Sequence, residues 1–107
     1  MNLAMIMKQV RRLQESMAEI KAKLATREVE GTAGGGMVTV VANGNQEIVA
    51  IRYEDGLFNE MDPEMIADLT AAAVNDALRK SKEMMNQEMA RLGAEMGLPL
   101  NDFMNMM

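Results

Sequence analysis

The sequence predicts an α/β fold of the α+β kind, with two long helices and a short antiparallel sheet between them. Three observations support this prediction: a heptad spacing of apolar residues at the start, a β-branched middle with an Asn-Gly turn, and a second helical pattern that opens at Asp-Pro-Glu. The 107 residues fit one domain. We assign residues 1–98 to that domain and residues 99–107 to a flexible, methionine-rich tail.

The first helix is predicted over residues 2–25. Its apolar residues recur at alternating spacings of three and four, which is the a/d pattern of a helix with one apolar stripe. The stripe consists of Leu3, Ile6, Val10, Leu13, Met17, Ile20 and Leu24. Neither Gly nor Pro interrupts it. At 1.5 Å per residue, this helix is roughly 37 Å long.

Three strands are predicted over residues 26–31, 37–42 and 47–53. The last two are rich in β-branched residues and flank Asn43-Gly44, a strong hairpin signal. The glycines at 34–36 fit a structural turn better than a phosphate-binding loop, because they lack the following Lys and Ser/Thr. The hairpin is apolar on both faces, which indicates burial by helices on one side and by helices or a second subunit on the other.

The second helix is predicted over residues 63–95, after an acidic loop at 54–61. Asp62 is its expected N-cap, Pro63 suits the first turn, and Glu64 complements the positive end of the helix. Its first half carries small residues such as Ala73 and Ala77, which let a neighbouring element approach closely. Gly97 and Pro99 must end it.

The two predicted helices are too long for a compact monomer. A compact domain of this length has a radius of gyration near 13 Å, whereas the helices are roughly 37 and 45–50 Å long. Their ends must project, and the projecting apolar stripe must be covered. The simplest cover is an identical subunit related by a two-fold axis, so the sequence predicts a homodimer.

The composition argues against an enzyme. The chain contains no His and no Cys, so Ser16 and Ser81 have no imidazole to activate them, and the usual zinc ligands are missing. The acidic stretch from Glu54 to Asp68 lacks the ligand spacing of an EF-hand and fits a solvated, helix-capping role better. A metal-dependent hydrolase built on that stretch is the weakest alternative. The 14 methionines suit flexible packing better than a soft-metal site. We predict no catalytic residue, cofactor, metal or small-molecule substrate.

The apolar segments are too short for a membrane. The N-terminal run from Met1 to Met7 is shorter than a secretory core, and its first cation follows it. No apolar run approaches the ~20 residues of a membrane span. We therefore expect a cytoplasmic protein with no membrane partner.

The charge is distributed unevenly. The net charge is -5, which alone argues against nucleic acid. Residues 1–27, however, carry six cations against two anions, whereas residues 28–76 carry ten anions against one cation. A second basic cluster lies at Arg79, Lys80 and Lys82. These cations fit either a solvated helix face or contact with duplex DNA, where phosphate contacts add up.

Several motifs together resemble the YbaB/EbfC family of small bacterial nucleoid-associated proteins. They are the Gly34–Gly36 run with Met37-Val38-Thr39-Val40, the Asn43-Gly44 turn, Ile48 to Ile51, Asp68-Leu69, and Ala72 to Lys80. The resemblance covers about residues 5–98. It implies a helix, a three-stranded antiparallel sheet and a second long helix. It also implies an intertwined, tweezer-like homodimer with projecting helical arms, which binds double-stranded DNA in the nucleoid and affects nucleoid organisation or gene expression.

The same resemblance implies which residues contact DNA phosphates. They are the cations of the two helices: Lys8, Arg11, Arg12, Lys21, Lys23, Arg79, Lys80 and Lys82. The alternative function is a protein–protein adaptor that uses methionine-rich helical surfaces and the acidic middle segment.

Overall fold

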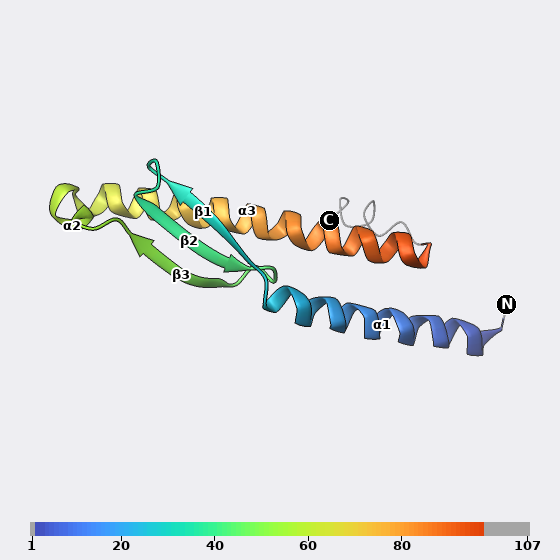
Figure 1. Cartoon of the computed structure of the whole chain (residues 1–107). Helices are drawn as coiled ribbons and strands as arrows, with labels where there is room; N and C mark the ends of the chain where they lie inside the picture. The colour runs from blue at the N-terminus through green and yellow to red at the C-terminus, as the bar shows by residue number, and fades with distance from the viewer. Residues whose placement is uncertain (1, 98–107) are drawn as a thin grey trace.

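A computed structural model describes residues 2–97 and shows a three-stranded sheet, a long helix along one face of it and a second long helix that extends from its end (Figure 1). The elements are α1 (Leu3–Ala25), β1 (Glu28–Ala33), β2 (Val38–Asn43), β3 (Ile48–Tyr53), α2 (Leu57–Glu60) and α3 (Pro63–Met96). The predicted fold class is confirmed. The tail expected at 99–107 lies outside the described residues.

The sheet is antiparallel throughout, with strand order β1-β2-β3. The first strand begins at Glu28, two residues later than predicted. The reason is local, because the backbone nitrogens of Thr26 and Arg27 still donate to Lys23 O and Leu24 O at the end of α1. The short helix α2 was not predicted; it follows Gly56, whose φ of 82° is left-handed, and lies within the expected acidic loop.

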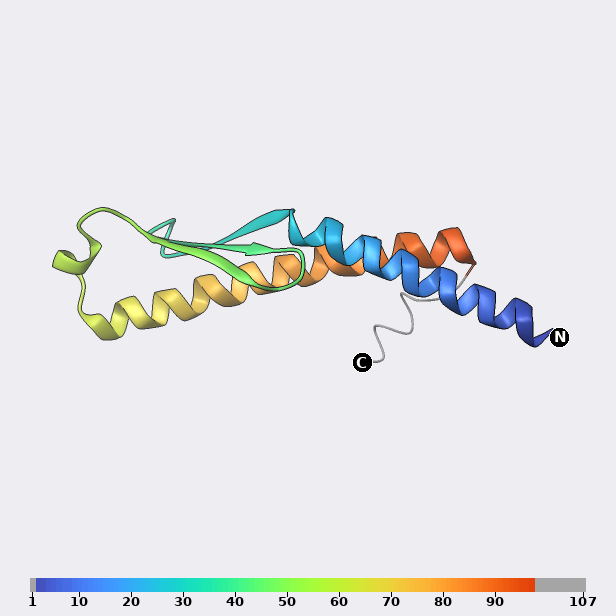
Figure 2. The ribbon, with the colours of Figure 1, turned by 90° about the horizontal axis from the view of Figure 1, so that it is seen from below.

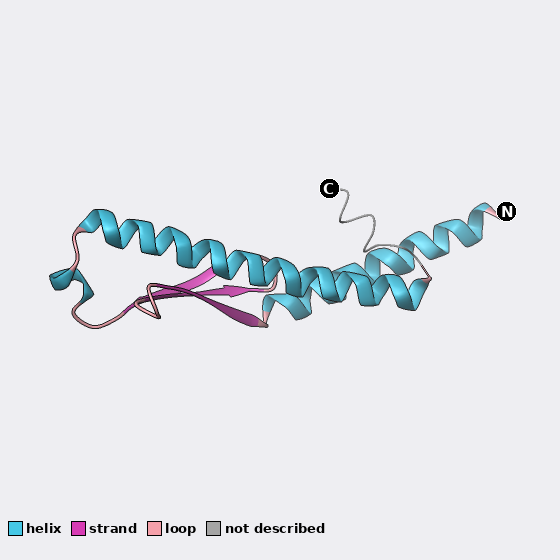
Figure 3. Ribbon diagram, turned by 90° about the horizontal axis from the view of Figure 1, so that it is seen from above, coloured by secondary structure: helices cyan, strands magenta, loops and turns pink. Residues whose placement is uncertain are grey.

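The core forms where α3 crosses one face of the sheet (Figure 3). Val38, Val40 and Ala42 of β2 are fully buried there, together with Ala73 and Ala77 of α3. Gly31 of β1 faces the same helix, and a Cβ at this position would lie 2.5 Å from Ala73 O and 2.7 Å from Ala77 Cα. The small residues of α3 therefore permit the close approach that the sequence predicted.

Strand β3 remains largely uncovered on its helix side. Ile51 pairs with Val40, so both side chains point to the face on which α3 lies. Because α3 lies over β1 and β2, however, Ile51 is 42% exposed and Ile48, which pairs with Ala42, is 39% exposed. Val49, at the bulge between them, is 53% exposed. The opposite face carries polar groups such as the Arg52–Glu30 ion pair. Within the described chain, a helix thus covers one face of the sheet, and that face only in part.

The molecule is elongated because both long helices extend past the sheet in the same direction (Figures 1 and 2). The Cα radius of gyration is 18.8 Å and the overall dimensions are 67 × 24 × 17 Å. This agrees with the argument from helix length that the ends must project. We call α1 and the part of α3 beyond Ser81 the helical arms.

The ends of the helices follow the predicted local signals. Asp62 caps α3 by accepting a hydrogen bond from Met65 N at 2.8 Å, and Pro63 occupies the first turn. Gly97 ends α3 in a left-handed conformation with φ 70°. The glycines at 34, 35 and 36 all have positive φ, which suits the turn between β1 and β2.

Candidate nucleic-acid interface

Three of the predicted DNA-contacting cations lie on the outer part of α1. Lys8, Arg11 and Arg12 are exposed, and within residues 2–97 none of them takes part in an ion pair. They fall within five consecutive positions, about 6 Å along the helix axis. Lys21, nearer the sheet, is likewise exposed and without an ion pair in that range. These side chains are available to anions such as phosphates.

The basic cluster of α3 is partly engaged within the protein. Arg79 forms ion pairs with Asp76 and with Glu83, the latter at 3.7 Å. Lys80 bridges to Asp76 at 3.2 Å and donates to Glu30 O at 2.9 Å. Among the cations of this cluster in the described chain, Lys82 is the one that makes no ion pair.

Asp76 connects this cluster to the edge of the sheet. Its carboxylate accepts a hydrogen bond from Thr32 N of β1 at 3.0 Å. That bond, followed by those from Arg79 and Lys80, lowers the pKa of Asp76 from 3.8 to about 2. Lys80 therefore helps to hold α3 against β1 through Glu30 O, whereas Arg79 acts within α3 by keeping Asp76 ionised.

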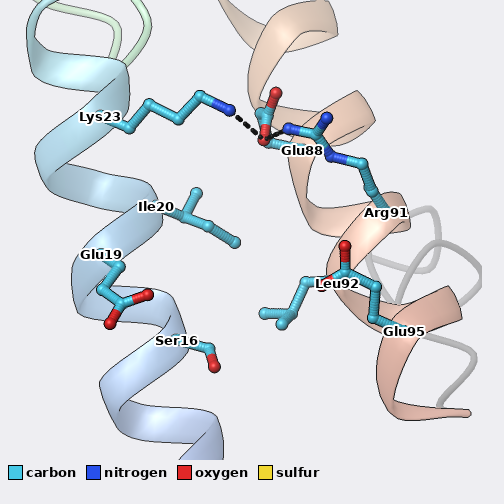
Figure 4. A pocket seen from close by; sticks show the side chains of 8 residues that line it. All are labelled: Ser16, Glu19, Ile20, Lys23, Glu88, Arg91, Leu92 and Glu95. Atoms are coloured by element: carbon cyan, nitrogen blue, oxygen red, sulfur yellow. Dashed lines mark hydrogen bonds and ion pairs between the residues drawn. The ribbon is translucent and has the colours of Figure 1, made fainter.

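Lys23 belongs to a second polar cluster, which joins the two arms (Figure 4). Glu88 of α3 is 8% exposed and accepts from Arg27 at 3.0 Å, from Lys23 at 3.5 Å and from Arg91. The hydrogen bond from Arg91, assisted by the charges of Arg91 and Lys23, lowers the pKa of Glu88. The carboxylate is thus an anion at neutral pH, and it partly neutralises Lys23.

Both arms start from one joint, the turn between β2 and β3. On the α1 side, Gly44 N donates to Leu24 O at 2.9 Å, and Asn45 Nδ2 donates to Lys21 O at 2.9 Å. On the α3 side, the buried Ser81 hydroxyl donates to Asn43 O at 2.6 Å and accepts from Gln46 N at 3.0 Å. The turn therefore fixes the origin of each arm relative to the sheet.

A cleft lies between the two arms. It has a volume of about 230 Å³ and is lined by Ser16, Glu19, Ile20, Lys23, Glu88, Arg91, Leu92 and Glu95 (Figure 4). Ser16 is the one hydroxyl-bearing residue of this lining, and the sequence contains no His that could activate it. Among the described residues, no group of three acidic, His or Cys side chains is placed to hold a metal ion. No helix within residues 2–97 is long and apolar enough to cross a membrane.

The structure thus separates the eight predicted cations into two groups. Five are exposed and without an ion pair within residues 2–97: Lys8, Arg11, Arg12, Lys21 and Lys82. Three are paired with carboxylates: Lys23, Arg79 and Lys80. Sequence reasoning missed Glu88 and Arg27, because partners 61 to 65 residues apart leave no local signal. The i,i+3 spacing of Glu88 and Arg91 was visible in the sequence.

These features define an elongated α+β protein that presents exposed cations, Lys8, Arg11, Arg12 and Lys21, on a helix projecting from the sheet. Residues 1–96 match the model of the YbaB/EbfC DNA-binding family. The chain belongs to this family, and the resemblance stated from the motifs is confirmed.

Relatives named nucleoid-associated proteins match nearly the whole chain. A nucleoid-associated protein of Pelotomaculum thermopropionicum is 45% identical over 92% of this chain and 93% of its own. One of Desulfotalea psychrophila is 44% identical over 98% of this chain and 100% of its own. The crystal structure of an uncharacterized protein from Helicobacter pylori, 24% identical, superposes with a TM-score of 0.71 over 78% of this chain and 87% of that one, which supports the fold.

Proposed function

We propose that the protein binds duplex DNA as a homodimer, mainly through phosphate contacts from the helical arms, and that it acts in nucleoid organisation or gene expression. Membership of a DNA-binding family whose relatives are named nucleoid-associated proteins supports a DNA partner and a place in the bacterial nucleoid. The observation that carries the proposal is the cluster of Lys8, Arg11 and Arg12, exposed on a projecting helix.

The pairing pattern ranks the cations. Lys8, Arg11 and Arg12 need not leave a carboxylate partner to reach a phosphate, so they are expected to contribute most. Arg79 and Lys80 must give up or share Asp76, and Lys23 must share Glu88. Their contributions are expected to be smaller. Because phosphate contacts are independent of base identity, sequence preference should be weak, with affinities of about 10⁻⁴–10⁻⁶ M at physiological salt.

A salt titration tests the phosphate contacts. Binding to a short mixed-sequence duplex is measured for the wild type and for the triple variant Lys8→Ala, Arg11→Ala, Arg12→Ala. The slope of log K against log salt should fall by roughly 0.9 for each phosphate contact removed. The matched control is Gln9→Ala, Gln14→Ala, Ser16→Ala on the same helix, which changes no charge. Equal slopes for the wild type and the basic-to-Ala triple variant would rule out this helix as a DNA arm.

The exposed apolar surface supports the homodimer. Ile48, Val49 and Ile51 are exposed on β3, and Phe58, which is 65% exposed, packs edge-on against Tyr53 at the end of the same strand. Because β3 is also an edge strand, it has a row of unpaired backbone groups that a second chain can pair with or cover. A second copy of the chain, related by a two-fold axis, would bury this surface on both subunits.

Light scattering tests the dimer on matched faces of one strand. Ile51→Lys places a charge on the uncovered helix-side face and should shift the mass toward the monomer. Arg52→Ser changes the opposite face of β3 and should leave the dimer intact. A wild type that is monomeric at micromolar concentration would refute the dimer.

A protein–protein adaptor is the second candidate function. It is favoured by an apolar groove between the arms, lined by Met17, Ile20, Leu24, Met85 and Met89 among others. Methionine side chains adapt to varied apolar partners. Partners that co-purify after complete nuclease digestion, and that are lost on Met85→Lys, would favour this function over DNA binding.

A further inference from the structure

Beyond the joint at the β2–β3 turn, the polar contacts between the arms converge on one carboxylate. Glu88 lies seven residues, or about 10 Å of helix, past Ser81. Its Oε1 accepts from Arg27 at 3.0 Å and its Oε2 from Lys23 at 3.5 Å, so it holds the end of α1 from two positions. Among the ion pairs of residues 2–97, those of Glu88 are the ones that link α3 to α1 and the residues directly after it.

Glu88 is buried and held in place by its surroundings, whereas the arms beyond it are packed less closely. The carboxylate is 8% exposed, and Arg91 on its own helix donates to the Oε2 that Lys23 also contacts. Ile20 and the nearly buried Leu92 face each other one turn further along the arms (Figure 4). Farther out, Ile6 and Val10 are 37% and 47% exposed, so apolar packing holds the outer arms only weakly.

We propose that Glu88 is a positioning residue, which ties α1 to α3 and so fixes the spread of the two helical arms. This proposal rests on the proposed function for its consequence: the spread sets where Lys8, Arg11 and Arg12 meet the phosphates. The tie itself is a property of the chain alone and can be measured without DNA.

Lys8 is far enough from the contacts of Glu88 that a small change in the angle between α1 and α3 displaces it by several ångströms. Lys8 lies 15 residues, or about 22 Å, from Lys23 along α1, so a change of about 10° at the tie moves Lys8 by about 4 Å. Such a displacement is comparable to the length of a charge-assisted contact and breaks the geometry of several phosphate contacts at once.

The expected change in DNA affinity on Glu88→Gln is opposite in sign to the change that net charge alone predicts. Glu88→Gln removes one negative charge and leaves Lys23, Arg27 and Arg91 unneutralised, so charge alone predicts tighter DNA binding. If the carboxylate sets the spread, the variant should instead bind more weakly and with a smaller salt slope, because fewer phosphates are contacted together. The matched control is Glu95→Gln, which removes the same charge from the same arm without touching the tie.

The spread is measured by the distance between two spin labels. The chain contains no Cys, so nitroxides can be attached at Gln14→Cys on α1 and Ala94→Cys on α3, both exposed, with unlabelled chain in excess to isolate intramolecular distances. Glu88→Gln should lengthen or broaden this distance, and Glu95→Gln should leave it unchanged. Arg91→Met should also leave it unchanged, because Arg91 lies on α3 and the contacts to Lys23 and Arg27 remain. Far-UV circular dichroism and Tm establish that each variant is folded.

Each outcome decides the proposal. A wider spread with weaker binding in Glu88→Gln, and neither change in Glu95→Gln, is the expected result. An unchanged distance overturns the tie, whatever the DNA affinity. A wider distance with unchanged or tighter binding overturns the link between spread and DNA contact. A wild type that binds no duplex overturns the proposed function and this consequence with it, while the distance measurement still decides the tie.

Discussion

The sheet-bearing half of the molecule and the helical arms are each stabilised by a different kind of contact. Around the sheet, apolar residues such as Val38, Val40 and Ala73 are fully buried, and Gly31 lies so close to α3 that even a Cβ would overlap it. Along the arms, the buried Glu88 with its half-exposed cationic partners, and Ile20 facing Leu92, are flanked by exposed apolar and basic side chains (Figure 4). We infer that the sheet-bearing half supplies most of the folding free energy, so that exposed residues of the arms can be substituted with little loss of stability.

The largest effect on stability is expected where β1 meets α3. Gly31→Val should destabilise the protein by about 3 kcal/mol, because a Cβ at this position would overlap the backbone of Ala73 and Ala77. Urea denaturation measures the change. Valine favours strands, so intrinsic propensity predicts the opposite sign. The neighbouring Thr32→Val on the exposed face is the control, and equal stability of both variants would contradict tight packing at Gly31.

The two serines of the chain compare the halves directly. Ser81 is fully buried and bonds both Asn43 O and Gln46 N, so Ser81→Ala should cost about 1–3 kcal/mol by leaving these groups unpaired. Ser16 lies on α1 and its side chain makes no hydrogen bond within the described residues, so Ser16→Ala should change stability by less than about 0.5 kcal/mol. Thermal unfolding of the two variants, each against the wild type, gives this comparison. Similar losses in both would mean that the joint is not special.

A pH titration examines how α3 is held against the edge of β1. The pKa of Asp76 falls from 3.8 to about 2 on folding, so its ionised form is the one that the native state stabilises. Its contribution is present above about pH 4 and is lost as the pH falls toward 2. Tm should therefore decline over this window, and Asp76→Asn should flatten the decline. Glu64→Gln, at the exposed start of α3, should not; an unchanged profile in Asp76→Asn would assign the acid sensitivity to other carboxylates.

The contrast between the halves also explains how far the sequence could predict the structure. Local signals sufficed for the element types: the heptad stripe for α1, Asp62 and Gly97 for the ends of α3, and Asn43-Gly44 for the hairpin. The short α2 escaped prediction because four residues carry no periodicity. Among the site residues, exposure of Lys8, Arg11 and Arg12 followed from their positions opposite the apolar stripe.

The partners of the remaining cations could not be predicted in the same way. Lys23 meets Glu88 across 65 residues of sequence, and Lys80 reaches Glu30 O across 50. Such pairs depend on how α1, β1 and α3 pack, and spacing within one helix does not encode that packing. The structure therefore shows which of the eight predicted cations are paired with carboxylates, and this pairing, which the sequence does not reveal, sets their expected order of contribution to DNA binding.

The smallest effect on stability is expected at the proposed site itself. The triple variant Lys8→Ala, Arg11→Ala, Arg12→Ala removes exposed side chains that make no ion pair within residues 2–97, and alanine favours helix. Its free energy of unfolding should stay within about 0.5 kcal/mol of the wild type in urea denaturation. Ser81→Ala should by contrast lower the stability clearly, because it leaves Asn43 O and Gln46 N unpaired. A triple variant as destabilised as Ser81→Ala would mean that the basic face of α1 supports the fold. In that case a loss of DNA binding in this variant could not be assigned to phosphate contacts.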